Sequence, residues 1–258
     1  MASENVESVR DPGVSAGPGA IQELRIETPR TARVAYLRSG PSPAEEVWTL
    51  LHGYAESAPG FLGRMSAAAR PRRLLVAPEG LSRFYRNPEA TGAGRGGGVG
   101  ASWMTRTERD AEIRDYVRYL DRVARTMEGQ VHVSRRKNHG TERDADAPST
   151  PLLRVVLGFS QGVHTAARWA VLGRTRIHRL IFWGASLPPD LPPSAAGRLR
   201  RAKVVLVRGE SDRLRRPDEE ERDERWLEDS EISYRILTHP GGHEVVPDLL
   251  ERLKGEVE

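Results

Sequence analysis

The sequence predicts an α/β fold in which a mostly parallel central sheet of about eight strands lies between two layers of helices. Short apolar runs recur along the chain with helical stretches between them, and the later runs are Val, Leu or Ile at nearly every position. Such runs are typical of strands buried on both faces of a parallel sheet, because half-exposed strands alternate. Helices must then cover both faces, which gives a three-layer α/β/α sandwich.

The expected strands follow one another along the chain. The first two, at residues 21–27 and 32–37, predict an antiparallel start. The later strands are expected at residues 47–51, 74–77, 153–157, 180–183, 204–207 and 232–237.

Helices are expected between these runs. Ile113, Val117, Leu120 and Ala124 recur at steps of three and four, which predicts an amphipathic helix over residues 107–127. Further helices are expected at residues 161–172, 217–229 and 245–254.

The length of 258 residues suits one domain, expected at residues 21–258. Residues 1–20 are rich in Ser, Gly, Pro and Glu without periodicity, which predicts a disordered terminal segment. Two stretches predict surface loops: residues 91–100 are rich in glycine, and residues 134–150 form a charged, polar insertion.

Composition excludes some function classes. There are no cysteines, so disulfides, Cys-ligated zinc and a thiol nucleophile are all excluded. The net charge is only +4 because acidic residues nearly balance the abundant arginine, and the basic run 135–137 lacks interleaved aromatic residues. We therefore expect no nucleic-acid partner. No secretory signal and no run of about 20 apolar residues is present, so we expect a cytoplasmic protein without stable membrane insertion.

The strongest functional signal is the pentapeptide Gly158-Phe159-Ser160-Gln161-Gly162, which follows an apolar run and precedes a helical stretch. A strand, a sharp turn and a helix form the context of a nucleophile elbow, with a serine at a strained position. Residues two before and two after that serine pass so close that a Cβ would clash, so glycine is needed there. Ser160 is therefore the candidate nucleophile.

Two residues that each follow a later strand complete a candidate triad. A serine hydroxyl needs a positioned base, and that base needs an acid to orient it. Asp212 follows the run 204–207, and His243 follows the run 232–237 after paired glycines. Glu210 is the rival acid and His239 the rival base.

The oxyanion of the reaction needs two backbone N–H donors. The amide of Gln161 starts the helix after the elbow, and the amide of Tyr54 follows a strand that ends in His52-Gly53. His52 is interpreted as a support for this loop. Phe61, Trp103 and Met104 are large apolar residues in loops near strand ends, so they either line the acyl pocket or belong to the core.

With these motifs the sequence resembles the carboxylesterase and phospholipase-like branch of the α/β-hydrolase superfamily, through Leu51-His52-Gly53, the elbow, Gly209 with Asp212, and Gly242-His243. The resemblance implies an acyl hydrolase that acts on a small ester and needs neither cofactor nor metal.

Other functions share these motifs. An acyl-thioesterase or a peptidase would use the same triad, and a non-catalytic binding protein on a hydrolase scaffold would normally lack one triad member. The sequence does not determine the oligomeric state.

Overall fold

The computed structural model describes residues 23–40, 44–86, 98–138 and 151–254. The chain divides into two compact units, Met1–Thr31 and Ala32–Glu258. In the first unit, residues 23–31 form neither helix nor strand, so the strand predicted at residues 21–27 is wrong over its described part. Leu24 and Ile26 are exposed there, and without burial nothing offsets the entropy lost on ordering the backbone. The segment 1–20 lies outside the described residues.

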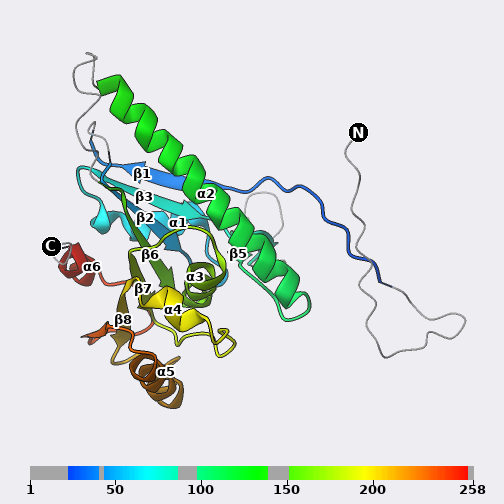
Figure 1. Ribbon diagram of the computed structural model, residues 1–258, viewed down its shortest axis with the longest axis vertical. Coiled ribbons are helices and arrows are strands. Elements are labelled where there is room, and N and C mark those ends of the chain that lie inside the picture. The colour runs from blue at the N-terminus through cyan, green and yellow to red at the C-terminus, as the bar shows by residue number, and fades with distance from the viewer. Residues whose placement is uncertain (1–22, 41–43, 87–97, 139–150, 255–258) are drawn as a thin grey trace, which may run out of the picture. The chain divides into compact units, whose positions relative to one another are not determined.

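The second unit contains a seven-stranded sheet in the order β1-β3-β2-β6-β7-β8-β9 (Figure 1). Its strands are β1 (Val34–Arg38), β2 (Glu46–Leu51), β3 (Arg73–Pro78), β6 (Leu153–Phe159), β7 (Arg179–Trp183), β8 (Lys203–Gly209) and β9 (Tyr234–His239). Only β1 is antiparallel to its neighbour, and the other pairings are parallel. The predicted α/β class and mostly parallel sheet are confirmed, with seven strands in the central sheet.

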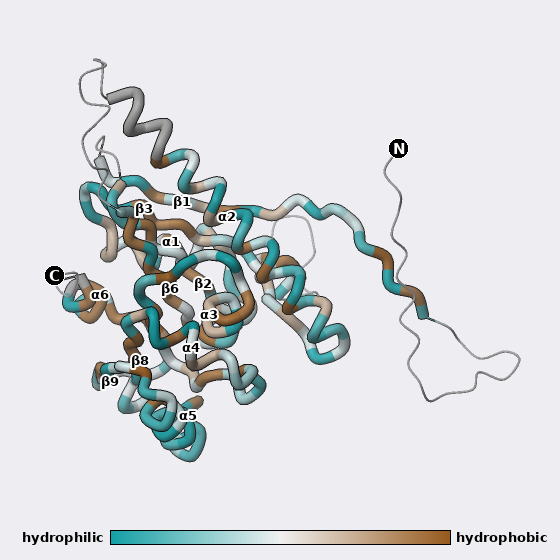
Figure 2. Tube along the Cα trace, viewed as in Figure 1, coloured by the Kyte–Doolittle hydropathy of each residue, from teal (hydrophilic) through white to brown (hydrophobic). Residues whose placement is uncertain are grey.

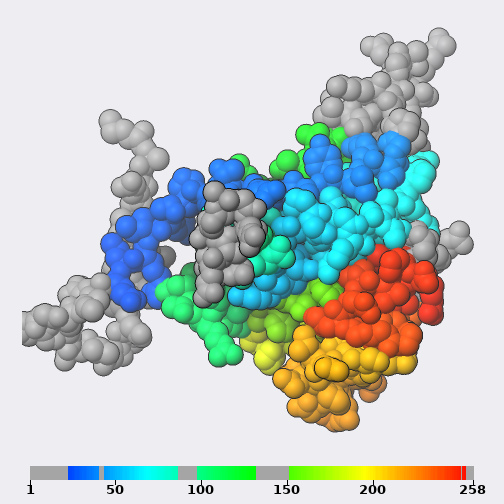
Figure 3. Space-filling model, turned by 180° about the vertical axis from the view of Figure 1, so that it is seen from behind, coloured from blue at the N-terminus to red at the C-terminus, as the bar shows by residue number. Residues whose placement is uncertain are grey.

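Helices cover both faces of the sheet: α1 (Ala58–Arg64), the short η1 (Ser66–Ala68), α2 (Arg109–Asn138), α3 (Gln161–Leu172), α4 (Ala195–Leu199), α5 (Pro217–Asp229) and α6 (Pro247–Lys254). On one face, α2 to α5 contribute to a single apolar cluster with the strands. On the other face, α1 and α6 pack on the sheet, and Figure 3 shows the red α6 beside the cyan segment that includes η1. These three layers confirm the predicted sandwich.

Neighbouring residues of the central strands belong to different cores. Val156 and Leu180 face α2 and α3, whereas Val155 and Ile181 face α1 and α6. Figure 2 shows the resulting hydrophobic strands in the middle of this unit. Both faces of a parallel strand are buried, which explains why its sequence does not alternate.

Two features depart from the predictions. A second, two-stranded sheet pairs β4 (Ser82–Tyr85) with β5 (Val99–Ser102), so the loop predicted at 91–100 ends in a strand. Helix α2 continues to Asn138, so the insertion predicted at 134–150 begins as helix because its arginines and lysine are good helix formers. Residues 139–150 lie outside the described part. None of the described helices is both long and apolar enough to cross a membrane.

Candidate active site

Ser160 lies at a sharp turn between the end of β6 and the start of α3. Its backbone has φ 53° and ψ −120°, a conformation that residues other than glycine rarely adopt. The backbone N–H of Ser160 donates to the carbonyl of Trp183 on the neighbouring strand, at 2.9 Å. The turn is therefore strained and fastened to the sheet, as the sequence predicts for an elbow.

The two glycines of the elbow are required sterically. A Cβ on Gly158 would lie 2.2 Å from the carbonyl oxygen of Gly162, and a Cβ on Gly162 would lie 2.1 Å from that of Leu51. Both contacts involve backbone, which cannot move aside locally. Strand β6, helix α3 and strand β2 can therefore meet at Ser160 only with glycine at these two positions.

Asp212 and His243 form a hydrogen-bonded pair. Asp212 follows β8 and is buried, and its Oδ2 lies 2.7 Å from Nδ1 of His243, in the loop after β9. The other oxygen of Asp212 accepts from the backbone N–H of Leu214 at 2.8 Å. A carboxylate at Nδ1 places the proton there and leaves Nε2 as the basic nitrogen.

The two loops that carry this pair are joined by backbone hydrogen bonds. Glu210 N–H donates to His239 O at 2.8 Å, and Ser211 N–H donates to Gly241 O at 3.1 Å. Gly209 makes the approach possible, because a Cβ there would lie 2.4 Å from the carbonyl oxygen of Gly242. The Asp212–His243 geometry is thus fixed by the main chain.

The rival residues occupy other positions. Glu210 is exposed and belongs to the surface. His239 is only 4% exposed, packs beside Trp183, and has no hydrogen-bond partner for either ring nitrogen in the described part of the chain. Neither geometry suits an orienting acid or a base.

Ser160, Asp212 and His243 line one cavity of about 320 Å³. His243 packs against Phe159 at 4.9 Å between ring centres, and its ring passes Gly184, where a Cβ would lie 3.2 Å from its Cε1. Gly184 has φ +73°, which favours glycine for a second reason. The cavity therefore brings the candidate nucleophile, base and acid into one space.

Tyr54 lies in a turn directly beside Ser160, since a Cβ on the preceding Gly53 would lie 3.3 Å from the Ser160 Cβ. Its side chain is 62% exposed and stacks on Phe84 of β4. Its amide hydrogen bonds to no acceptor within the described part of the chain.

His52 and Glu56 hold this turn in place. His52 is fully buried; its Nδ1–H donates to Gly53 O at 2.7 Å, and its Nε2 accepts from Gly80 N–H at 2.9 Å. Burial lowers the pKa of His52, so the ring is neutral. Glu56 accepts from Gly53 N–H at 2.8 Å and pairs with Arg64. The interpretation of His52 as a support for the loop is confirmed.

Gln161 starts α3 and ties the elbow to the end of β5. Its side-chain oxygen accepts from the Trp103 N–H at 3.2 Å, and its nitrogen donates to Met104 O at 3.2 Å. The side chain is thus occupied by the scaffold, and its backbone amide lies at the first position of the helix.

The structure favours core over pocket for the three predicted acyl-pocket residues. Phe61 and Trp103 are each 1% exposed and belong to the two main cores, and Trp103 also donates to His52 O at 2.9 Å. Met104 packs against one core, with its sulfur against Arg168. None of the three lines the cavity that contains Ser160. Phe61 lies in helix α1 and packs in the core between that helix and the sheet, and the other two pack in the core on the opposite face.

Residues of α3, of α5 and of the position before α5 line the cavity instead, among them His164, Arg216, Glu219 and Asp223. Burial lowers the pKa of His164, which leaves a neutral ring one turn after Ser160. Burial also raises the pKa of Asp223, although hydrogen bonds from Arg222 and the Leu187 N–H oppose that rise. In the sequence these charged residues look like an ordinary solvated helix face.

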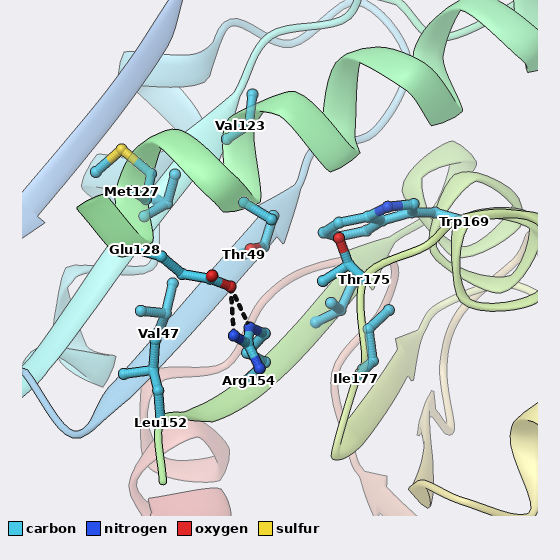
Figure 4. Close-up of a pocket in the computed structure, with 13 residues that line it drawn as sticks. Val47, Thr49, Val123, Met127, Glu128, Leu152, Arg154, Trp169, Thr175 and Ile177 are labelled. Atoms are coloured by element: carbon cyan, nitrogen blue, oxygen red, sulfur yellow. Dashed lines mark hydrogen bonds and ion pairs between the residues drawn. The ribbon is translucent and has the colours of Figure 1, made fainter. Parts of the chain in front are cut away.

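A second cavity between α2 and the sheet has only about 10 Å³ (Figure 4). Apolar side chains surround it, and Glu128 closes one side by pairing with Arg154. Such a volume holds at most one water molecule. It is a packing gap and not a substrate site.

The sequence matches no protein-family model and no curated protein, but its fold matches solved structures. Esterase PE8 matches with a TM-score of 0.59 at 19% identity, over 88% of this chain and 97% of that one. A carboxylesterase from Mesorhizobium loti matches with 0.56 at 17% identity, over 87% and 95%. Acyl-protein thioesterase 2 from Zea mays matches with 0.55 at 13% identity, over 87% and 99%. The chain has the α/β-hydrolase fold, and the resemblance noted in the sequence is confirmed at the level of the fold.

Proposed function

We propose that the protein hydrolyses carboxylic esters of small molecules through an acyl-enzyme on Ser160. The observation that carries this proposal is the strained Ser160 turn, which shares one cavity with the hydrogen-bonded pair of Asp212 and His243. A serine at such a turn, a histidine with Nδ1 held by a buried carboxylate, and an adjacent free amide are the parts that acyl transfer needs.

In the first half of the reaction, Nε2 of His243 removes the Ser160 proton and Oγ attacks the ester carbonyl carbon. Asp212 stabilises the imidazolium that forms. The backbone amides of Tyr54 and Gln161 hold the oxyanion. The imidazolium then gives its proton to the departing alcohol, and a water molecule activated by His243 hydrolyses the acyl-enzyme.

The Tyr54 amide is suited to this role because a hydrogen bond to the opposite side of its peptide group fixes its direction. Gly53 C=O and Tyr54 N–H belong to one planar trans peptide, so they point in opposite directions. The His52 ring donates to that carbonyl, which sets the orientation of the N–H and polarises it further. An oxyanion donor that needs no reorganisation stabilises the transition state more than a mobile one.

The test is hydrolysis of p-nitrophenyl esters of increasing acyl length by the wild type and by Ser160→Ala. We expect turnover that the substitution reduces by roughly 10⁶-fold. Equal turnover by both proteins would contradict the proposal.

A further inference from the structure

The cavity beside Ser160 has a wall of charged side chains. They come from β8, the loop after it and the start of α5: Arg208, Asp212, Arg215, Arg216, Glu219, Glu220 and Asp223. Hydrocarbon placed against such a wall would strip water from the charges without replacing its hydrogen bonds. The cavity also has apolar lining from Phe182, Leu206 and Val207, but the substrate group that lies against the charged wall is polar.

Most of these charges are already paired. Arg215 holds Glu220 through two hydrogen bonds of 2.9 and 2.6 Å. Arg208 pairs with Glu224 at 2.6 Å, Asp223 with Arg222 at 2.6 Å, and Asp212 with His243 at 2.7 Å. These pairs build the wall, so they are not available to a ligand without a large loss.

Arg216 and Glu219 are different. In the part of the chain that the structure describes, neither side chain has a hydrogen bond or an ion pair, although they are three residues apart. Arg216 is exposed at the position before α5, and Glu219 is half-buried in its first turn. Glu219 lines the same cavity as His164 and Asp223, which lie deeper in the protein than Arg216. The cavity thus offers one unpaired anion inside and one unpaired cation near solvent.

The position of His243 indicates which half of the ester binds there. Its imidazolium must hand a proton to the oxygen of the departing alcohol, so that alcohol lies on the His243 side of Ser160. His243 lines this cavity, whereas the turn at Tyr54 lies against Ser160 from strand β2. A volume of about 320 Å³ is at the lower end for ligand pockets, so the alcohol is small.

Building on the ester hydrolysis proposed above, we propose that the alcohol half of the substrate is a small zwitterion, with an ammonium group that binds Glu219 and a carboxylate that binds Arg216. A guanidinium is well suited to a carboxylate because its planar donors match the two oxygens. The chemistry is unchanged: the ester C–O bond breaks, the Ser160 Oγ–C bond forms, and the zwitterionic alcohol leaves with the proton of His243.

Four butyrate esters test this proposal by their kcat/KM values. O-butyryl-L-carnitine carries an ammonium and a carboxylate, butyrylcholine only the ammonium, 3-butyryloxybutanoate only the carboxylate, and monobutyrin neither. We expect the zwitterion to be hydrolysed best and monobutyrin worst, each charge contributing roughly five- to tenfold.

Variants assign the two contacts. Glu219→Gln should remove the advantage of the ammonium, so that O-butyryl-L-carnitine falls to the level of 3-butyryloxybutanoate. Arg216→Gln should remove the advantage of the carboxylate. Glu221→Gln and Arg225→Gln neutralise exposed charges of the same helix, which pair with each other and do not line the cavity, and should leave the order of the four esters unchanged.

The outcomes separate the two proposals. If p-nitrophenyl butyrate is cleaved in a Ser160-dependent way but monobutyrin is the best of the four esters, or Glu219→Gln and Arg216→Gln leave the order unchanged, the zwitterion proposal is overturned and ester hydrolysis stands. If the wild type cleaves neither p-nitrophenyl butyrate nor any of the four esters, the proposed function itself fails, and the zwitterion proposal with it.

Discussion

Ser160 lies between two walls whose polar groups are used differently. In the turn at residues 52–56, His52, the Gly53 peptide groups and Glu56 all make hydrogen bonds within the chain. On the side of β8 and α5, Arg216 and Glu219 make none with the described residues. Hydrogen bonds within the chain fix the geometry of the first wall around the free amide of Tyr54, whereas the unpaired charges of the second wall are the proposed recognition groups. Under the two proposals, the site separates the part that acts on every ester from the part that selects one.

Backbone strain follows the same division. Ala55, in the first wall, has φ 63°, and its N–H donates to Ala101 O of β5 at 2.9 Å. Gly100 allows this approach, because a Cβ there would lie 2.4 Å from the Ala55 carbonyl oxygen. The small sheet of β4 and β5 therefore holds the turn in a conformation that an alanine would otherwise avoid.

The largest effect should come from the hydrogen-bonded pair of Asp212 and His243. Asp212→Asn keeps the shape of the side chain but no longer holds the His243 ring in the required tautomer. We expect kcat to fall by roughly 10⁴-fold for all esters, with the fold retained by circular dichroism. The matched control is Glu210→Gln, two residues away and exposed, which should leave kcat unchanged. A comparable loss in the control would reverse the assignment of the acid.

A smaller effect is expected from the first wall. Glu56→Gln replaces the carboxylate that accepts from Gly53 N–H and pairs with Arg64. We expect kcat to fall by roughly 10- to 100-fold with little change in KM, and equally for every leaving group, because the oxyanion donor is shared by all substrates. Glu45→Gln breaks an exposed pair with Arg72 and serves as the control. A loss that differed among leaving groups would contradict the assignment of this wall to the step that all esters share.

The smallest effect concerns stability. Asp190 lies in the loop between β7 and α4, where Arg168 of α3 holds it at 2.7 Å. Burial alone would raise the pKa of Asp190, but hydrogen bonds from Arg168 and Arg109 lower it to about 2. A carboxylate whose pKa is lower in the folded state stabilises the fold at pH values above its pKa in the unfolded chain. That stabilisation is lost as the pH falls toward 2.

Asp190→Asn should therefore lower the free energy of unfolding at pH 7 by about 1–3 kcal/mol, since it leaves Arg168 buried without its partner. Urea denaturation at a series of pH values should show the difference between wild type and variant shrinking below about pH 4. A difference that does not change with pH would argue against the ion pair as its cause.

The triad could be predicted from the sequence because each member follows a strand whose apolar run is unmistakable. Parallel strands bring their carboxyl ends to one edge, so Ser160, Asp212 and His243 were expected together. The substrate cavity could not be predicted in this way. Phe61 and Trp103 have the composition of a pocket wall but fill the core, and Glu219 lies in a charged run that is typical of a solvated helix.

The small sheet also could not be predicted, because a sequence pattern reports only on neighbouring residues. Strands β4 and β5 have four residues each, and the glycines before β5 favour a loop when no partner strand is considered. Their pairing depends on contacts between distant segments, which no local pattern contains. The turn at Tyr54 depends on that pairing, so its support became visible only in three dimensions.

The most direct test of the account is covalent labelling with a fluorophosphonate probe, followed by intact-mass measurement and peptide mapping. We predict one adduct per chain, located on Ser160, absent in Ser160→Ala and slowed strongly in Asp212→Asn. An adduct on another serine, or no adduct on a folded wild-type protein, would contradict the assignment of Ser160 as the nucleophile.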